Sequence, residues 1–317
     1  MNKRKALLIA CPLLLLLIAL ILCISLWNHR TANTEAERLY LPQGTTSEAL
    51  CDSVHADGTF RLMARTLGLD KRVRAGSYVV EPHMKTLALV RKLRNGQQDP
   101  IRLTIGKFRT PVQLNDYLNQ KLMHNDFHVT LDSFYIIRPN TYEFYWTVTP
   151  AQFMLRMGKE YDKQSGGSGF SGSSGILPSF KEVIILASIV EEESNHNPEK
   201  PLIASVYLNR LKKGMPLQAD PTVKYAVGDF SLRRILNKHL ATESPFNTYL
   251  HTGLPPAPIC LPSDASVKAV LNAPETGYLY FCASDKMDGT HRFAATLSEH
   301  QRNAAAFHRA LNTRGIK

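Results

Sequence analysis

The longest apolar segment of the chain lies near its start. Residues 6–27 are almost all apolar, with Pro12 and Ser25 as the mild exceptions. About twenty apolar residues are needed for a helix to cross the hydrocarbon core of a bilayer. We therefore expect a transmembrane helix over residues 6–27.

Basic residues before this segment indicate its orientation. Lys3, Arg4 and Lys5 favour a cytoplasmic N-terminus over residues 1–5, because positive flanks stay on the cytoplasmic side. The expected location is thus a single-pass cell inner membrane protein whose folded part lies outside the cytoplasm. A cleaved signal peptide fits less well, since the apolar run is long and no small-x-small cleavage site follows Trp27.

A small mixed module is expected over residues 28–98. Its predicted order of strand, helix, helix and strand resembles that of LysM-like glycan-binding modules, and a plain spacer domain is the alternative. The predicted elements are a strand at 39–41, a helix opened by the capping box 45–48, a helix ending at Gly68, a strand at 77–80 and a helix from Thr86 to Gly96.

The next region, residues 99–164, contains an unusually aromatic stretch. Alternating apolar residues predict a strand at 101–105. Further along, Tyr142, Phe144 and Trp146 alternate in the same way, as on the inner face of a half-buried strand. Aromatic rings also stack on sugar faces, so core packing and saccharide contact are both open for these three residues.

Residues 165–175 are rich in glycine and serine. The segment 167–172 matches the spacing G-x-G-x-x-G of dinucleotide-binding turns, but no apolar strand precedes it and more serine and glycine follow. We expect a flexible connector, of natural or engineered origin, rather than a nucleotide site.

The most informative pattern follows the connector. Residues 183–190 (VIILASIV) are apolar on nearly every face, which predicts a helix buried all round, and it runs directly into Glu191, Glu192 and Glu193. A carboxyl group held against an apolar wall has a raised pKa and can act as a general acid near neutral pH. Because residues two apart on a helix differ by about 200° in direction, Glu191 and Glu193 cannot flank one bond together. One is expected to act and the other to support it.

Polar residues in three later segments are candidates for substrate contact, each with a structural alternative. Side chains near the end of an amphipathic helix over 198–213 can reach a ligand or satisfy backbone carbonyls, and those in the turn before Pro221 can bind a ligand or cap the turn. A loop before a proline-rich segment is a usual place for binding residues. The candidates are Asn209, Arg210, Gln218, Asp220, Asn247, Thr248 and Tyr249.

Composition and charge exclude several classes of protein. The formal net charge is +11, but lysine and arginine are dispersed rather than gathered with aromatics on one helix, so no nucleic acid partner is expected. Beyond the apolar segment, Cys51, Cys260 and Cys282 form no C-x-x-C pair and the histidines are scattered. We expect neither a disulfide framework, nor a metal, nor a cofactor.

Several separate motifs, in order, resemble those of the endolytic murein transglycosylase MltG family (YceG-like). The resemblance covers nearly the whole chain. It is carried by 75–78 (AGSY), 139–142 (PNTY), 187–193 (ASIVEEE), 204–211 (ASVYLNRL), 214–223 (GMPLQADPTV), 247–249 (NTY), 253–256 (GLPP), 278–281 (YLYF) and 291–293 (HRF).

The resemblance implies an α+β fold and a cell-wall enzyme that cleaves nascent peptidoglycan glycan strands internally, leaving 1,6-anhydro-muramyl ends. The family's catalytic glutamate falls on Glu193, and Glu191 matches the first acidic residue of its E-x-E motif. Residues 99–164 would be the N-terminal part of the catalytic region, and residues 176–317 the catalytic YceG-like domain. Glu192 stands where relatives often have lysine and Phe246 where many have tyrosine, and neither change touches the proposed acid.

Two other functions remain as alternatives at this point. One is a membrane-anchored peptidoglycan-binding scaffold whose partners are penicillin-binding synthases or the division machinery. The other is a muramidase-type hydrolase, which would need a second carboxylate or an activated water; Glu143, Glu199 and Asp220 are candidates for that carboxylate.

Overall fold

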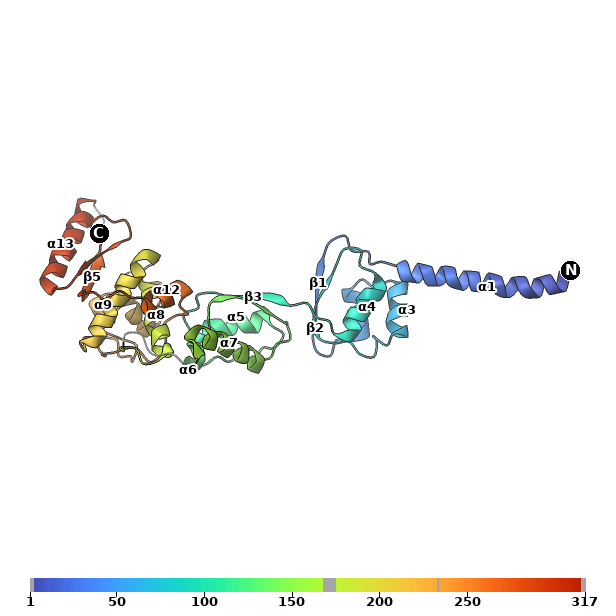
Figure 1. Ribbon diagram of the computed structural model, residues 1–317, viewed down its shortest axis with the longest axis horizontal. Helices are drawn as coiled ribbons and strands as arrows, with labels where there is room; N and C mark the ends of the chain where they lie inside the picture. Colours follow the sequence, from blue (N-terminus) through green and yellow to red (C-terminus); the bar gives the residue numbers. More distant parts are fainter. Residues whose placement is uncertain (1–2, 168–174, 233, 315–317) are drawn as a thin grey trace. The chain divides into compact units, whose positions relative to one another are not determined.

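The computed structural model describes residues 3–167, 175–232 and 234–314 of the chain. The described residues form helices and three two-stranded sheets, so the expected mixed α+β class is confirmed (Figure 1). The chain divides into two compact units. One contains residues 1–103, 121–124 and 143–148, and the other contains residues 104–120, 125–142 and 149–317.

The N-terminal segment forms one helix, α1 (Lys3–Asn28), with Pro12 inside it. Among the residues that the structure describes, none of the helices combines the length and apolarity needed to cross a membrane. The structure therefore does not support the span expected over residues 6–27.

The first unit contains the module predicted from the sequence, with strand, helix, helix and strand in that order. Strands β1 and β2 pair antiparallel, with Leu39 opposite Tyr78. The helices start where side chains cap them, since Thr46 accepts a hydrogen bond from the Ala49 amide and Asp57 from the Phe60 amide. The elements are β1 (Glu37–Leu41), α2 (Ser47–Ser53), α3 (Gly58–Thr66), β2 (Gly76–Val80) and α4 (Thr86–Asn95).

Residues 101–165 contribute a further sheet and three helices. In β4 the side chains of Tyr142 and Phe144 are buried, which favours core packing over saccharide contact for these two rings. Trp146 packs edge-on against Tyr40, with the ring centroids 5.1 Å apart. The elements are β3 (Ile101–Ile105), which pairs with β4 (Asn140–Phe144), and helices α5 (Pro111–Lys121), α6 (Leu131–Phe134) and α7 (Pro150–Ser165). Of the Gly/Ser-rich connector at 165–175, residues 168–174 lie outside the described residues.

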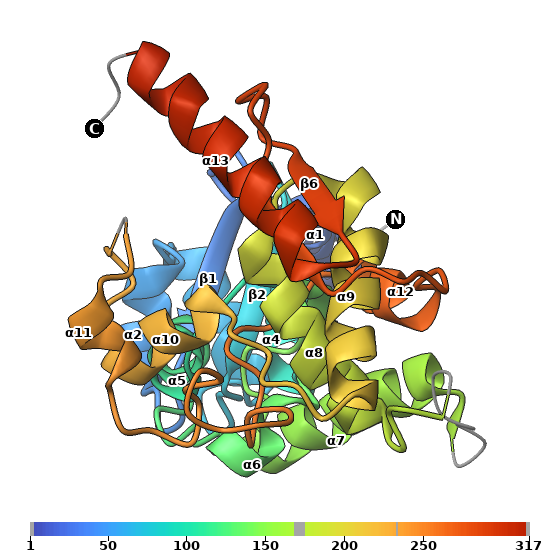
Figure 2. The same cartoon turned by 90° about the vertical axis from the view of Figure 1, so that its left-hand side faces the viewer.

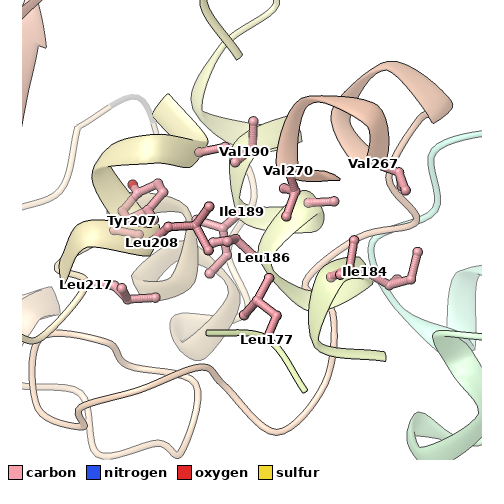
Figure 3. Close-up of a cluster of buried hydrophobic side chains, with 14 of the residues drawn as sticks. Leu177, Ile184, Leu186, Ile189, Val190, Tyr207, Leu208, Leu217, Val267 and Val270 are labelled. Atoms are coloured by element: carbon pink, nitrogen blue, oxygen red, sulfur yellow. The ribbon is translucent and has the colours of Figure 1, made fainter. Parts of the chain in front are cut away.

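The core of the second unit is built around α8 (Phe180–Glu193). Every residue from Val183 to Val190 is buried, as the sequence pattern predicts. Helices α9 (Lys200–Lys212) and α12 (Asp264–Leu271) pack against α8 and against each other (Figure 2). Figure 3 shows Leu186 and Ile189 of α8 beside Leu208 of α9 within this apolar cluster.

The polar group within this buried helix is satisfied. The Ser188 hydroxyl donates to the Ile185 carbonyl at 2.7 Å and accepts from the Ile259 amide at 3.0 Å. A buried hydroxyl without partners would lower the free energy of unfolding. These two bonds therefore allow Ser188 to be buried and hold the segment around Ile259 against α8.

The remaining elements of the second unit surround this core. Helix α13 packs on strands β5 and β6, which pair antiparallel. These elements are η2 (Asn197–Glu199), α10 (Asp220–Val227), α11 (Asn237–Leu240), β5 (Tyr280–Ala283), β6 (His291–Ala294) and α13 (Leu297–Thr313).

Candidate active site

The three glutamates at the end of α8 point to three different sets of partners. Glu193 is the last residue of the helix and is half-buried. The Tyr207 hydroxyl, from α9, donates a hydrogen bond of 2.5 Å to its Oε1. The apolar turns of α8 and α9 therefore hold Glu193 at the edge of the core, where part of the residue remains exposed.

The surroundings of Glu193 bring the pKa of its carboxyl close to neutral pH. Burial, which disfavours the charged form, raises its pKa to about 7, and the negative charge of Asp220 acts in the same direction. The hydrogen bond from Tyr207 and the charges of Lys224 and Arg210 oppose this rise. At neutral pH the carboxyl is thus partly protonated and can give or take a proton.

Tyr207 is a fixed hydrogen-bond donor to that carboxyl. Its side chain is 2% exposed and packs edge-on against Phe281, with the ring centroids 5.8 Å apart. Burial and the neighbouring Glu193 raise the pKa of the Tyr207 hydroxyl well above its ordinary value, so it remains protonated. This bond fixes the orientation of Glu193.

Glu191 faces α9 and α12. Its Oε2 accepts hydrogen bonds from the hydroxyls of Ser263 and Ser266 at 2.6 and 2.5 Å and lies 3.1 Å from the Lys200 ammonium. Burial alone raises its pKa, but the bonds from Ser263, Ser266 and Lys200 together hold it below the ordinary value. Glu191 is therefore an ionised anchor between helices and not a proton donor.

Glu192 faces a third direction. Its two oxygens pair with Lys107 at 2.9 Å and with Arg109 at 3.0 Å. Burial again favours the neutral form, but these two cations hold the pKa of Glu192 below its ordinary value. Of the three glutamates, Glu193 alone combines a raised pKa with a neutral hydrogen-bond donor.

The structure gives Asn209 and Arg210 backbone partners. The Asn209 amide nitrogen donates to the carbonyls of Thr276 and Tyr278 at 2.8 and 2.9 Å. The Arg210 guanidinium donates to the carbonyls of Leu279 and Leu217 at 2.7 and 2.8 Å and is 8% exposed. These contacts favour the structural interpretation for both residues, which tie α9 to the segments before β5 and α10.

Asn247 and Thr248 are also occupied by backbone groups. Asn247 is fully buried and donates to the carbonyls of Leu240 and Thr242, each at 2.9 Å. Thr248 is 1% exposed and accepts a hydrogen bond of 3.0 Å from the Ala219 amide. Both residues hold the loop in place.

Gln218, Asp220 and Tyr249 are predicted binding residues with accessible side chains. Gln218 and Asp220 are exposed, and Tyr249 is half-buried. The Tyr249 hydroxyl donates a hydrogen bond of 2.7 Å to Asp220. Helix α10 packs against α8, and Arg210, one turn after Tyr207 on α9, donates to the Leu217 carbonyl just before α10. This packing places Asp220 and Tyr249 near Glu193, with which both interact electrostatically.

Sequence reasoning missed the partners that give the glutamates their different roles. It assigned no role to Tyr207, and it did not single out Lys200 or Lys224. A lysine buried at the start of an apolar helix, as Lys200 is, signals a paired carboxylate. In the parts of the chain that the structure describes, no group of three or more potential metal ligands gathers.

The pH dependence of the reaction should respond to Tyr207. If protonated Glu193 is needed, the rate falls as pH rises through about 7. Tyr207→Phe removes a bond that favours the charged form, so the pKa of Glu193 rises and the falling limb of the profile moves to higher pH. Initial rates of the glycan cleavage that the sequence motifs lead us to expect, taken across the neutral range, measure this shift. Tyr225→Phe, a tyrosine of α10 without a bond to Glu193, is the control, and an unmoved limb in Tyr207→Phe would refute the role of this bond.

Comparison with known proteins identifies similar chains over both units. The model of the YceG-like family matches residues 39–306. The endolytic murein transglycosylase of Bacillus subtilis is 46% identical over 124 residues, which are 39% of this chain and 34% of that protein. The protein of the same name from Streptococcus pneumoniae strain D39 is 34% identical over 128 residues, or 39% of this chain and 23% of that protein.

A solved structure is similar over more of the chain. The crystal structure of a YceG-like protein from Listeria monocytogenes matches with a TM-score of 0.52 and 28% identity, covering 85% of this chain and 99% of that one. The aligned part spans about a third or less of the length of the two curated relatives.

Proposed function

Because the chain belongs to the YceG-like family, whose model matches residues 39–306, we propose that it is an endolytic peptidoglycan lytic transglycosylase. The names of its relatives in Bacillus and Streptococcus support this substrate and reaction. The observation that carries the proposal is Glu193, a half-buried carboxyl with a pKa of about 7 held by Tyr207.

The proposed reaction uses this one carboxyl twice. Protonated Glu193 gives its proton to the glycosidic oxygen between N-acetylmuramic acid and N-acetylglucosamine, and the bond from that oxygen to the muramyl C1 breaks. The oxygen of the muramyl C6 hydroxyl then bonds to C1, and the Glu193 carboxylate takes the proton of that hydroxyl. The products are a shortened strand with a 1,6-anhydro end and a released strand, without consumption of water.

The surroundings of Glu191 and Glu192 are consistent with Glu193 as the single acid–base residue. The pKa values of Glu191 and Glu192 are lowered, and each carboxylate is bonded to cations. A hydrolase that activates water needs a second carboxylate as a base. Since the nucleophile of the proposed reaction belongs to the substrate, neither neighbour has to fill that role. Asp220 is the carboxylate near Glu193 that a hydrolase would use, and the chemical nature of the new strand ends distinguishes the two reactions.

The second candidate function is a peptidoglycan-binding scaffold, and the module in the first unit favours it. That module has the predicted strand, helix, helix and strand order, which is similar to the order of LysM-like modules. Incubation of the whole chain with purified glycan strands distinguishes the two functions. Shortened strands support the enzyme, and retention on the glycan without shortening supports the scaffold, with synthases or division proteins as its expected partners.

The proposal also includes a location outside the cytoplasm, at the cell inner membrane, where nascent glycan strands are present. Basic residues 3–5 and the apolar run at 6–27 support it. Protease added to cells with a permeabilised outer envelope and a sealed inner membrane should digest the folded units. Their protection under those conditions would contradict the proposed location.

A further inference from the structure

Asp220 and Tyr249 form a hydrogen-bonded pair near Glu193. Asp220 is the first residue of α10, and Tyr249 follows the buried Thr248 in the loop 247–250. Thr248 joins the two segments, since its carbonyl accepts from the Gln218 amide at 3.1 Å and its hydroxyl accepts from the Ala219 amide at 3.0 Å. The backbone that carries Asp220 is therefore fixed to the backbone that carries Tyr249.

Two further features hold this pair in place. The hydroxyls of Thr222 and Thr248, both buried, lie 2.8 Å apart and share a hydrogen bond. Gln218 has a φ of +50°, a left-handed conformation that is unfavourable for a residue with a side chain. Such strain persists only where surrounding contacts enforce it, and here it directs the chain into α10 so that Asp220 faces Tyr249.

The charge of Asp220 is not neutralised by a close cation. Among the ion pairs of the described residues, Asp220 takes part in none, and the hydrogen bond it receives comes from the neutral Tyr249 hydroxyl at 2.7 Å. Glu191 and Glu192, by contrast, both pair with cations. An exposed carboxylate without such a partner, held near Glu193, can interact with a positively charged species bound there.

The proposed reaction produces such a species. When the bond from the glycosidic oxygen to C1 breaks, positive charge develops on the sugar ring, and a preorganised anion stabilises it. We propose that the carboxylate of Asp220, oriented by Tyr249, stabilises this positive charge while Glu193 transfers its proton. Asp220 neither forms a bond nor takes a proton in this step, so the atoms and protons balance as in the reaction above. This inference rests on the proposed function.

The same charge has a second consequence, which makes the inference measurable. Among the described residues, the charged and titratable groups found to interact with the Glu193 carboxyl include Tyr207 and Arg210 of α9, Asp220 and Lys224 of α10, and Tyr249. Asp220 is the one carboxylate among them, and its charge keeps the pKa of Glu193 raised. Loss of that charge lowers the pKa of Glu193, which is the opposite of the change expected from Tyr207→Phe.

The test is Asp220→Asn in the full chain, with purified glycan strands as the substrate. Asparagine keeps the acceptor for Tyr249 but removes the charge, so we expect kcat to fall about 10- to 100-fold while KM changes little. The falling limb of the pH profile should move to lower pH. Tyr249→Phe should also lower kcat, but by a smaller factor of about 3- to 10-fold. Asp229→Asn, an exposed carboxylate just after the same helix, should behave as the wild type.

Two results would overturn the inference. They are an unchanged kcat in Asp220→Asn, with or without a raised KM, and a pH limb that stays in place or moves to higher pH. The proposed function fails separately, if the wild type itself releases no strand with a 1,6-anhydro end. A wild type that makes such ends, together with a fully active Asp220→Asn, rejects the role of Asp220 alone.

Discussion

Replacing Glu193 with glutamine is expected to remove most of the catalytic activity while leaving the fold and glycan binding intact. Glutamine keeps the shape of the side chain and an oxygen that accepts the Tyr207 hydrogen bond, but it cannot transfer a proton. General acid–base catalysis contributes roughly 10²- to 10⁴-fold, so kcat should fall by about that factor. Initial rates of strand shortening measure the loss.

Stability against pH provides a check that the Glu193→Gln protein is folded. In the folded wild type the pKa of Glu193 is raised to about 7 from an ordinary value of 4.5. Glu193 therefore adds to the free energy of unfolding at low pH, and this contribution is lost as pH rises through about 7. Glu193→Gln should lack this loss. The control is Glu275→Gln, an exposed glutamate in the loop before β5, which should keep full activity. A fully active Glu193→Gln protein would disprove the assignment of the acid.

Replacing Lys200 with methionine is expected to cause the largest loss of stability. Lys200 is 4% exposed and Glu191 is 13% exposed, so the variant leaves a buried carboxylate without its cation. Breaking a buried ion pair by removing one partner costs about 3 kcal/mol in the free energy of unfolding. Since the pKa of Glu191 is lowered in the wild type, the contribution of the pair is present above the ordinary pKa of a glutamate and is lost as pH falls. Urea unfolding at neutral and acid pH measures both effects.

Two matched variants make this result interpretable. Lys212→Met replaces an exposed lysine at the end of the same helix and should change the free energy of unfolding little. Glu191→Gln combined with Lys200→Met removes both charges and should be less destabilised than Lys200→Met alone. A single Lys200→Met protein as stable as the wild type would show that Glu191 is anchored by the two serines alone.

The part of the site that the sequence predicts is the part that depends on local pattern. The apolar run at 183–190 predicts a helix buried all round, and α8 has that burial. The angular argument that separates Glu191 from Glu193 also agrees with the structure, in which one faces α12 and the other Tyr207. Both inferences follow from helical periodicity, which a single segment specifies.

The part that could not be predicted depends on contacts between distant segments. Asn209 and Arg210 bond to carbonyls about seventy residues later in the chain, and no periodicity in either segment indicates that pairing. Ser263 and Ser266 lie even further from Glu191, and their hydroxyls look like ordinary helix-capping groups until α12 is placed against α8. The pKa order of the three glutamates therefore required the packed structure.

The chemical nature of the newly formed strand ends tests the central claim most directly. Purified glycan strands are incubated with the full chain, and the products are weighed by mass spectrometry. The proposed reaction consumes no water, so the new muramyl ends should lack the mass of one water relative to reducing ends. New ends that carry that water would contradict the claim, because they would show that water, and not the C6 hydroxyl of the substrate, attacks C1.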